Sequence, residues 1–439
     1  MINLASLPTF PHTCPECTGS LETVDWYIPG MRNLAKVRCI HCKREYFIDL
    51  PSGHALLYPS VLDMQTGKAE SLSFSTRTWF DVQLEQSYAR RSDATLKVEE
   101  EKFRTVEKAA ILNCLDGIYG HGLEKLLNIQ HYLDHHQLDI IVIVPKFLRW
   151  LVPDGVAAIW TVHTSLGNSQ AWNDGFAAFV KQHTAQFSEC YLLSTLTELE
   201  PIDYQIERFT RIQPFPTDTW LDRLSKPTVT FIWREDRLWQ NPLSSQFVIR
   251  LRKKLRIKQS TVLQKRKVIA LATLLRTYFP TLDFAVAGIG KPGGLPNWIT
   301  DLRTQGITEA VERTWSQRYA DSHMVIGVHG SNMLLPSALA GSTIDLIPED
   351  RWGNLAQDII YSPNQTGREI MFRYQYFPIT SSPSAVAIAA KKIITRAPEV
   401  FLRYQRKYNA HSDLQNDLFR LFKYQKDIHE KLKQYLHDV

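Results

Sequence analysis

The sequence predicts an α/β protein with two doubly wound domains, a small cysteine-rich ribbon before them and helices after them. Three observations support this fold class. Two CxxC pairs lie near the N-terminus, two series of short apolar runs alternate with helical patterns, and the C-terminal part has helical apolar periodicity. Because 439 residues exceed what one core ordinarily holds, we expect four parts, at residues 1–50, 51–222, 223–385 and 386–439.

The composition is that of a folded globular chain, with 44% hydrophobic and 22% charged residues. The sequence has no run of about eighteen apolar residues, and its first residues lack the basic start and apolar segment of a secretory signal. We therefore expect a cytoplasmic protein without a transmembrane segment. Four of the six cysteines form the CxxC pairs, and we expect Cys114 and Cys190 to be core thiols.

The cysteine-rich module carries Cys14 and Cys17 in one loop and Cys39 and Cys42 in another. Each CxxC loop brings two thiolates toward one tetrahedral ion, and the adjoining segments KVRC and EYFIDL have strand patterns. A redox dithiol or two disulfides fit less well, because one dithiol would leave the second pair without a purpose. We predict a zinc ribbon in which four thiolates close the coordination sphere, so that the zinc is structural.

Three strand-like runs define the first α/β domain. LDIIVIVP, VAAIWTV and CYLLSTL are short β-branched runs of the kind buried in parallel sheets. Before them, LDGIYGHGLEKLLN has two glycines at a turn and then leucines near helical spacing. We expect a helix that begins just after this Gly-His-Gly turn.

A second series begins at PTVTFIWREDRLW, a strand that runs into a charged cluster. The patterns then predict a helix in TVLQKRKVIALATLLRTYF, a strand in DFAVAGIG, a helix in WITDLRTQGITEAVERTW and a strand in HMVIGV. The tail has helical periodicity in AVAIAAKKIITRA and in DLQNDLFRLFKYQKDIHEKLKQYL. We therefore expect a second doubly wound domain followed by helices.

The segment IGVHGSN, at the end of the last strand of this series, has the composition of an anion site. In a doubly wound sheet, ligands bind beyond the carboxyl ends of the strands. His329 lies over that edge, and Gly330 lets the backbone approach a ligand. Ser331 and Asn332 can cap the next helix or donate to phosphate oxygens. We predict that these residues bind a diphosphate; an ordinary turn histidine is the alternative.

Two residues on neighbouring loops fit the same ligand. Asp345 lies in the next strand, STIDLIP, where a carboxylate can accept from both hydroxyls of a ribose. Arg234 follows the strand VTFIW and could neutralise the diphosphate. Each also has an ordinary structural explanation, because Asp345 could bond backbone amides and Arg234 could pair with Glu235 or Asp236.

Residues 237–282 form a stretch with many basic residues and no acidic one. Such a stretch attracts anions or forms a solvated helix face. It keeps a second class of function open, in which the ribbon and this stretch bind the phosphate backbone of a nucleic acid and the α/β domains are a scaffold.

The HGSN segment with its following acidic strand, together with FIWREDRLW, resembles glycosyltransferase family 61. His329-Gly330, Asp345 and Arg234 match features of that family. The resemblance implies a GT-B architecture, in which two Rossmann-like domains face each other across a cleft and the C-terminal one holds a nucleotide-sugar donor. It also implies the transfer of a hexosyl or pentosyl group to an acceptor hydroxyl.

Such a transfer requires that the leaving diphosphate be stabilised and that the acceptor hydroxyl be deprotonated. His329, Arg234 and the amides at the helix start would stabilise the diphosphate, so we expect no catalytic metal. The base should come from the first domain, where His121 is the best candidate, with Asp116 or Glu124 behind it. The acceptor could be a polysaccharide, a protein or an anionic polymer.

Overall fold

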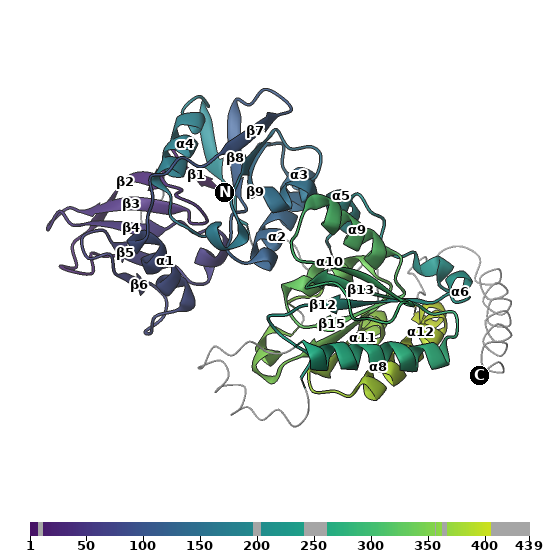
Figure 1. The fold of residues 1–439 in the computed structure, drawn as a ribbon. Coiled ribbons are helices and arrows are strands. Elements are labelled where there is room, and N and C mark those ends of the chain that lie inside the picture. The colour runs from purple at the N-terminus through teal and green to yellow at the C-terminus, as the bar shows by residue number, and fades with distance from the viewer. Residues whose placement is uncertain (8–11, 196–202, 241–260, 356, 362–366, 405–439) are drawn as a thin grey trace. The chain divides into compact units, whose positions relative to one another are not determined.

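The computed structural model describes residues 1–7, 12–195, 203–240, 261–355, 357–361 and 367–404. The chain divides into two compact units, Met1–Glu200 and Pro201–Val439 (Figure 1). This division lies before residue 222, where the sequence predicts the end of the first α/β domain.

The first unit begins with a five-stranded sheet in which every neighbouring pair is antiparallel. Its strands, in spatial order, are β2 (Leu21–Tyr27), β3 (Leu34–Cys39), β4 (Glu45–Asp49), β5 (Ser60–Asp63) and β6 (Ala69–Ser71). KVRC lies in β3 and the strand part of EYFIDL in β4, as predicted. Helix α1 (Trp79–Ala89) packs against β5 and β6.

The second sheet of this unit has six strands in the order β1-β11-β8-β9-β10-β7. The parallel strands are β8 (Lys108–Asn113), β9 (Asp139–Pro145), β10 (Ala158–Val162) and β11 (Glu189–Leu192), and the antiparallel edges are β1 (Ile2–Asn3) and β7 (Val98–Lys102). The connecting helices are α2 (Tyr119–Leu127), α3 (Ile129–His135) and α4 (Asp174–Thr184). The predicted start of the first helix is wrong, because α2 begins at Tyr119 and includes the Gly-His-Gly segment. The chain runs from β8 to β10 on one side and returns to β11 on the other, so the topological switch point lies between β8 and β11.

The two sheets of the first unit share one hydrophobic core. Val37 and Ile48 of the antiparallel sheet belong to the same buried cluster as Ile111, Ile143 and Phe176 of the parallel sheet and helix α4. The antiparallel sheet also continues past residue 50, where the sequence predicts the ribbon to end. The cysteine-rich strands are therefore packed into the first unit.

The second unit is built on a six-stranded sheet in which all neighbouring strands are parallel. The order is β14-β13-β12-β15-β16-β17. The bounds are β12 (Thr228–Trp233), β13 (Asp283–Ile289), β14 (Ile299–Thr304), β15 (Met324–Val328), β16 (Thr343–Ile347) and β17 (Tyr374–Pro378). Numbered along the chain, this is the order 3-2-1-4-5-6 of dinucleotide-binding folds, with its switch point between β12 and β15.

Helices cover this sheet. The helices of this unit are α5 (Ile206–Thr210), α6 (Trp220–Arg223), α8 (Val262–Tyr278), α9 (Glu309–Ala320), α10 (Leu334–Leu339), α11 (Gly367–Arg373) and α12 (Pro383–Tyr404). Helix α12 packs against α8, and Leu271, Leu275 and Ile393 join the core under the sheet. The predicted tail helix in AVAIAAKKIITRA is confirmed as part of α12. The second predicted tail helix, within residues 405–439, lies outside the described residues.

One predicted helix of this unit is wrong in its first part. WITDLRTQGITEAVERTW contains strand β14 and only then helix α9. Gly306 separates the two, and the side chain of Thr308 caps α9 by accepting from the backbone amide of Val311. Among the helices that the structure describes, none is long and apolar enough to cross a membrane.

Candidate functional site

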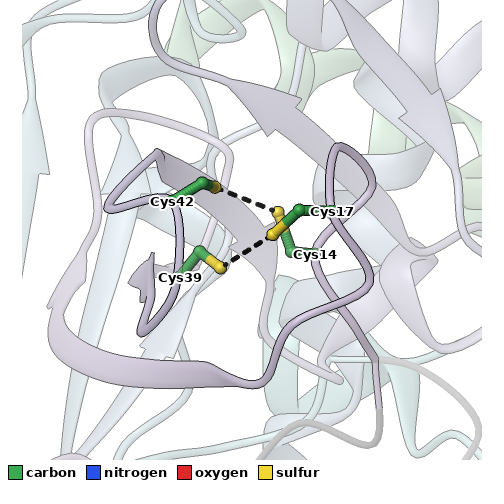
Figure 2. A group of neighbouring side chains, drawn as sticks. All are labelled: Cys14, Cys17, Cys39 and Cys42. Atoms are coloured by element: carbon green, nitrogen blue, oxygen red, sulfur yellow. Dashed lines mark hydrogen bonds between the residues drawn. The ribbon is translucent and has the colours of Figure 1, made fainter.

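Four cysteine side chains converge beside the first sheet (Figure 2). Sγ of Cys14 lies 3.7 Å from Sγ of Cys42, and Sγ of Cys17 lies 3.5 Å from Sγ of Cys39. All four sulfur atoms lie within 4.8 Å of one another. A tetrahedron with metal–sulfur bonds of about 2.3 Å has edges of about 3.8 Å, so these positions fit a single zinc-sized ion.

The two CxxC loops have the same backbone geometry. In each, the amide after the second cysteine donates to the carbonyl of the first: Thr18 to Cys14 at 2.9 Å and Lys43 to Cys39 at 3.1 Å. Both Thr18 and Lys43 are left-handed, with φ of 56° and 61°. This repeated turn aims both thiols of a pair at the same point, which favours metal binding over a redox dithiol.

The surroundings of Cys14 favour its ionised form. Burial opposes ionisation, but the hydroxyl of Tyr46, 3.3 Å from Sγ, and the amides of Cys17 and Glu16 outweigh burial and lower the pKa of Cys14 to about 6. A thiolate is the form that binds a metal.

Arg234 and His329 flank the switch point of the sheet in the second unit. Arg234 directly follows β12, and His329 directly follows the neighbouring strand β15. Nη1 of Arg234 donates to the carbonyl oxygen of His329 at 2.8 Å and to Oδ1 of Asn332 at 2.6 Å. Nη1 of Arg237 donates to the same His329 carbonyl at 2.6 Å. Nε and Nη2 of Arg234 also donate to the carboxylate of Asp236, the ordinary pairing that the sequence left open. Two guanidinium groups are thus held at the edge where doubly wound sheets bind ligands.

Gly330 allows the guanidinium group of Arg234 to reach the carbonyl oxygen of His329. Its φ is 145°, which other residues rarely adopt, and a Cβ at this position would lie 2.1 Å from Nη1 of Arg234. The sequence predicts that Gly330 lets the backbone approach a ligand, and the structure shows that the group it admits is an arginine. Ser331 and Asn332 then start a short 3-10 turn, Ser331–Met333, that leads into the six-residue helix α10.

The imidazole of His329 lies between two carboxylates. Its Nδ1 bonds Oδ2 of Asp345 at 2.6 Å, and its Nε2 lies 2.9 Å from Oδ2 of Asp358. Burial alone would lower the pKa of His329, but the hydrogen bonds and charges of the two carboxylates outweigh it and raise the pKa to about 9. His329 is therefore an imidazolium at neutral pH.

Asp345 has a partner that the sequence did not predict. It lies within β16, its exposed fraction is 0%, and its Oδ2 is bonded to His329. Desolvation raises the pKa of Asp345 even against the charge of His329. In the structure Asp345 contacts the imidazolium of His329, whereas the sequence predicts that it contacts a ribose.

Two residues of this cluster were missed from the sequence. Arg237 was a visible candidate, because it belongs to the charged run after β12. Asp358 lies on a loop after the 3-10 turn Glu349–Asn354 and carries no pattern that would have marked it. The sequence thus supplied Arg234, His329, Gly330, Asn332 and Asp345, and the structure brings them together.

A second polar cluster lies beyond the carboxyl end of β8 in the first unit, beside its switch point. Oδ1 of the buried Asp116 lies 3.5 Å from Nδ1 of His121, and its Oδ2 lies 2.9 Å from Nζ of Lys125. Burial opposes ionisation of Asp116, but Lys125 and His121 outweigh it and lower its pKa. Of the predicted trio, the structure joins Asp116 and His121, while Glu124 lies one turn further along α2.

His54 completes this cluster from another part of the chain. Its ring centre lies 4.3 Å from that of His121, and burial lowers its pKa to about 3, so it stays neutral. Gly53 positions it through a left-handed φ of 57°, where a Cβ would lie 2.6 Å from Oγ1 of Thr195 after β11. His54 is distant in sequence from His121, so no local pattern could have found it.

The residue types here also suit a metal ion. One ligand atom from each of His54, Asp116 and His121 lies within 4.8 Å of the others. However, the ammonium group of Lys125 already balances Asp116 and donates to the carbonyl of Leu115 at 2.8 Å. Because a divalent ion would add two uncompensated charges beside this buried pair, the charge balance favours acid–base chemistry.

The basic stretch at 237–282 is described only in part, because residues 241–260 lie outside the described residues. Of the remainder, Nζ of Lys265 donates to the carbonyl of Gly293 at 3.2 Å, and Nζ of Lys267 donates to that of Gln240. The guanidinium of Arg276 lies 4.8 Å from the ring centre of Trp298. These basic groups make contacts within the fold.

No family model and no curated protein matches this sequence, so the resemblance to family 61 stays a prediction. Among solved structures, the chain is similar to the Escherichia coli ADP-heptose heptosyltransferase II, with 11% identity, 66% of this chain and 99% of that chain covered, and a TM-score of 0.36.

It is also similar to the iron-containing dodecameric glycosyltransferase TibC of enterotoxigenic E. coli, with 11% identity, 81% and 83% covered, and a TM-score of 0.26. A third similar structure is that of accessory secretory proteins 1, 2 and 3 of Streptococcus pneumoniae, with 8% identity, 90% and 68% covered, and a TM-score of 0.27. At these TM-scores the similarities carry no argument about function.

Proposed function

We propose that this protein is a glycosyltransferase that moves a sugar from a nucleotide-diphosphate donor to an acceptor hydroxyl without a catalytic metal. The observation that carries the proposal is the group of cations at the switch point of the second unit. Arg234 and Arg237 meet at the carbonyl of His329, at the strand edge of a sheet with the 3-2-1-4-5-6 order, and the buried imidazolium of His329 is paired with Asp345 and Asp358. That edge is where such sheets bind dinucleotides.

These cations suit a leaving diphosphate. As the bond between the sugar and the diphosphate breaks, negative charge develops on the leaving oxygen, and fixed positive groups stabilise it without reorganising. Helix α10 has only six residues, so the guanidinium groups of Arg234 and Arg237 supply more of this stabilisation than its amides. Asp345, fully buried on His329, holds the imidazolium in place instead of binding a ribose.

The base in this proposal is His121. Nε2 of His121 takes the proton of the acceptor hydroxyl, and the acceptor oxygen bonds the anomeric carbon as the bond from that carbon to the diphosphate breaks. The electron pair of that bond leaves with the diphosphate, and the proton stays on His121. Asp116, held by Lys125, faces Nδ1 and stabilises the imidazolium that forms.

The cysteine cluster has a separate, structural role in this proposal. Four thiolates around one zinc ion leave no position for a substrate or a water molecule. Cys14, Cys17, Cys39 and Cys42 would hold the ion, and its contribution would be to the stability of the antiparallel sheet.

A thermal-shift screen tests the donor site. ADP, GDP, UDP, CDP and TDP are added in turn, without added divalent metal, and one of them should raise the melting temperature, because a ligand that binds only the folded state stabilises it. Arg234→Ala should abolish the shift. Arg313→Ala, which removes an exposed arginine paired with Glu309 on α9, should retain it.

A flat response to every nucleoside diphosphate would overturn the donor site. If DNA or RNA bound instead, with an affinity that falls steeply as salt rises, the nucleic-acid alternative would replace it. Lys265, Lys267 and Arg276 of the stretch at 237–282 make contacts within the fold and do not favour that outcome.

A further inference from the structure

A row of aromatic rings leads from His121 to the surface of the first unit. The ring centre of Trp79 lies 6.0 Å from that of His121 and 6.1 Å from that of Tyr58. Phe74 stacks on Tyr58 with ring centres 5.6 Å apart. Each step along this row is close to the length of one pyranose unit.

Two of these rings are exposed, and Tyr58 between them is partly buried against the core of the unit. Trp79 is 46% exposed and Phe74 is 47% exposed, and the adjoining Leu56 and Leu57 are also exposed. An isolated exposed apolar side chain is ordinary, but a contiguous exposed aromatic surface marks a binding site. Here that surface adjoins the predicted catalytic base.

The start of helix α1 holds Trp79 in position. Thr78 caps the helix by accepting from the amides of Phe80 and Asp81, and Asp81 accepts in return from the amide of Thr78. Oδ1 of the buried Asp81 also accepts from the hydroxyl of Ser60, at the start of β5, at 2.6 Å. This capping box and its link to the sheet fix the first residue of the helix, which is Trp79.

We propose that the exposed rings of Trp79 and Phe74, with the partly buried Tyr58 between them, form the binding surface for a neutral oligosaccharide acceptor, whose reacting hydroxyl lies at His121. The apolar C–H face of a pyranose packs on an aromatic ring, and the hydroxyl groups at its edge stay free for His121 and for water. The exposed rings of Trp79 and Phe74 accommodate two sugar units of one chain.

The charges of the polar cluster around His121 favour a neutral acceptor. Lys125 balances Asp116, and His54 is neutral, so the polar end of the surface offers no surplus positive charge to an anionic polymer. This inference rests on the proposed function, because the base and the reaction are those of the glycosyltransferase. It adds the class of acceptor and the residues that select it.

Saturation-transfer NMR tests the surface without needing the donor. The full chain is mixed with neutral gluco-, galacto- and manno-oligosaccharides, and at least one should receive saturation through its ring C–H protons. Trp79→Ala and Phe74→Ala should weaken its binding roughly tenfold, the upper end of one aromatic contact. Trp79→Phe should restore most of the binding. Phe103→Ala removes an even more exposed ring elsewhere in the first unit and should have no effect.

The outcomes separate this inference from the proposed function. If a nucleoside diphosphate binds but no oligosaccharide in the set receives saturation, the acceptor surface is overturned while the donor site stands. Loss of a dimer in Trp79→Ala, measured by light scattering, would show that the rings bind a second copy and would also overturn it. So would metal analysis in which His54→Ala and His121→Ala each lose one equivalent of bound metal.

Discussion

At the residue scale, the titration of His329 gives the clearest pH prediction. Its folded pKa is about 9, against 6.5 for a free histidine. A raised folded pKa contributes stability that is complete below 6.5 and is lost as the pH rises through 9. We expect the melting temperature to fall between pH 6.5 and pH 9. In His329→Gln, the part of this fall that is due to the imidazolium should be absent. The measurement is the melting temperature of both proteins from pH 6 to about 10. Parallel curves for the two would contradict the assignment of an imidazolium.

Gly330 provides a second residue-scale prediction. In Gly330→Ala, the new Cβ would lie 2.1 Å from Nη1 of Arg234, so either the guanidinium or the loop must move. We expect the affinity for the nucleoside diphosphate to fall roughly ten- to a hundredfold, the size of one lost charge-assisted hydrogen bond. Titration calorimetry measures it. Gly353→Ala is the matched control, because a Cβ there meets nothing within 4 Å.

The sequence predicted the residues that follow strands and missed those that reach the clusters from elsewhere. Arg234 and His329 were identifiable because each directly follows an apolar strand, and the ends of neighbouring parallel strands meet at one edge. His54 and Asp358 had no such mark. Lys125 could be placed on α2, but only the fold shows that its ammonium group reaches Asp116.

At the scale of elements, the cysteine loops yield the third prediction. Cys39→Ser removes a ligand, and because metal binding is coupled to folding, we expect the loss of one equivalent of zinc and a lower melting temperature. Metal analysis and a thermal scan check it together. Cys190→Ser changes a buried thiol of β11 away from the loops and should leave the metal content unchanged. A wild-type protein with no bound metal would contradict the zinc assignment.

The sequence predicted strands correctly where both faces of the strand are buried. The β-branched runs that became β9 and β10 lie in the middle of a parallel sheet, so their apolar pattern is continuous. Edge strands lack that pattern: β7, with the sequence VEEEK, is paired on one side only and was not predicted. β14 is also an edge strand, and its mixed polar and apolar residues were taken for a helix.

At the scale of the whole molecule, the proposed function assigns the base to the polar cluster of the first unit and the donor site to that of the second. His121→Ala should lower kcat roughly 10²- to 10⁴-fold, the usual contribution of a general base, and leave nucleotide affinity unchanged. Arg234→Ala should instead weaken donor binding and also lower kcat. Steady-state kinetics with the donor identified by the thermal screen, together with nucleotide titration, distinguish the two. An active His121→Ala variant would move the base elsewhere.

The presence of two α/β units followed from two series of strand runs, but the extent of the first unit did not. The joint between the antiparallel and the parallel sheet consists of contacts such as those that join Val37 and Ile48 to Ile111 in one core. These contacts link residues far apart in the chain, and a local pattern carries no information about them.

That shared core has a consequence for how this protein could be cut or recombined. A zinc ribbon is often treated as an interchangeable module that can be excised and fused elsewhere. Here strands β3 and β4, which adjoin the cysteine loops, bury their apolar face against the parallel strands of the first unit, so a fragment of residues 1–50 would expose that face and leave β8 and β9 uncovered. Chimeras of this protein should exchange residues 1–200 as a whole.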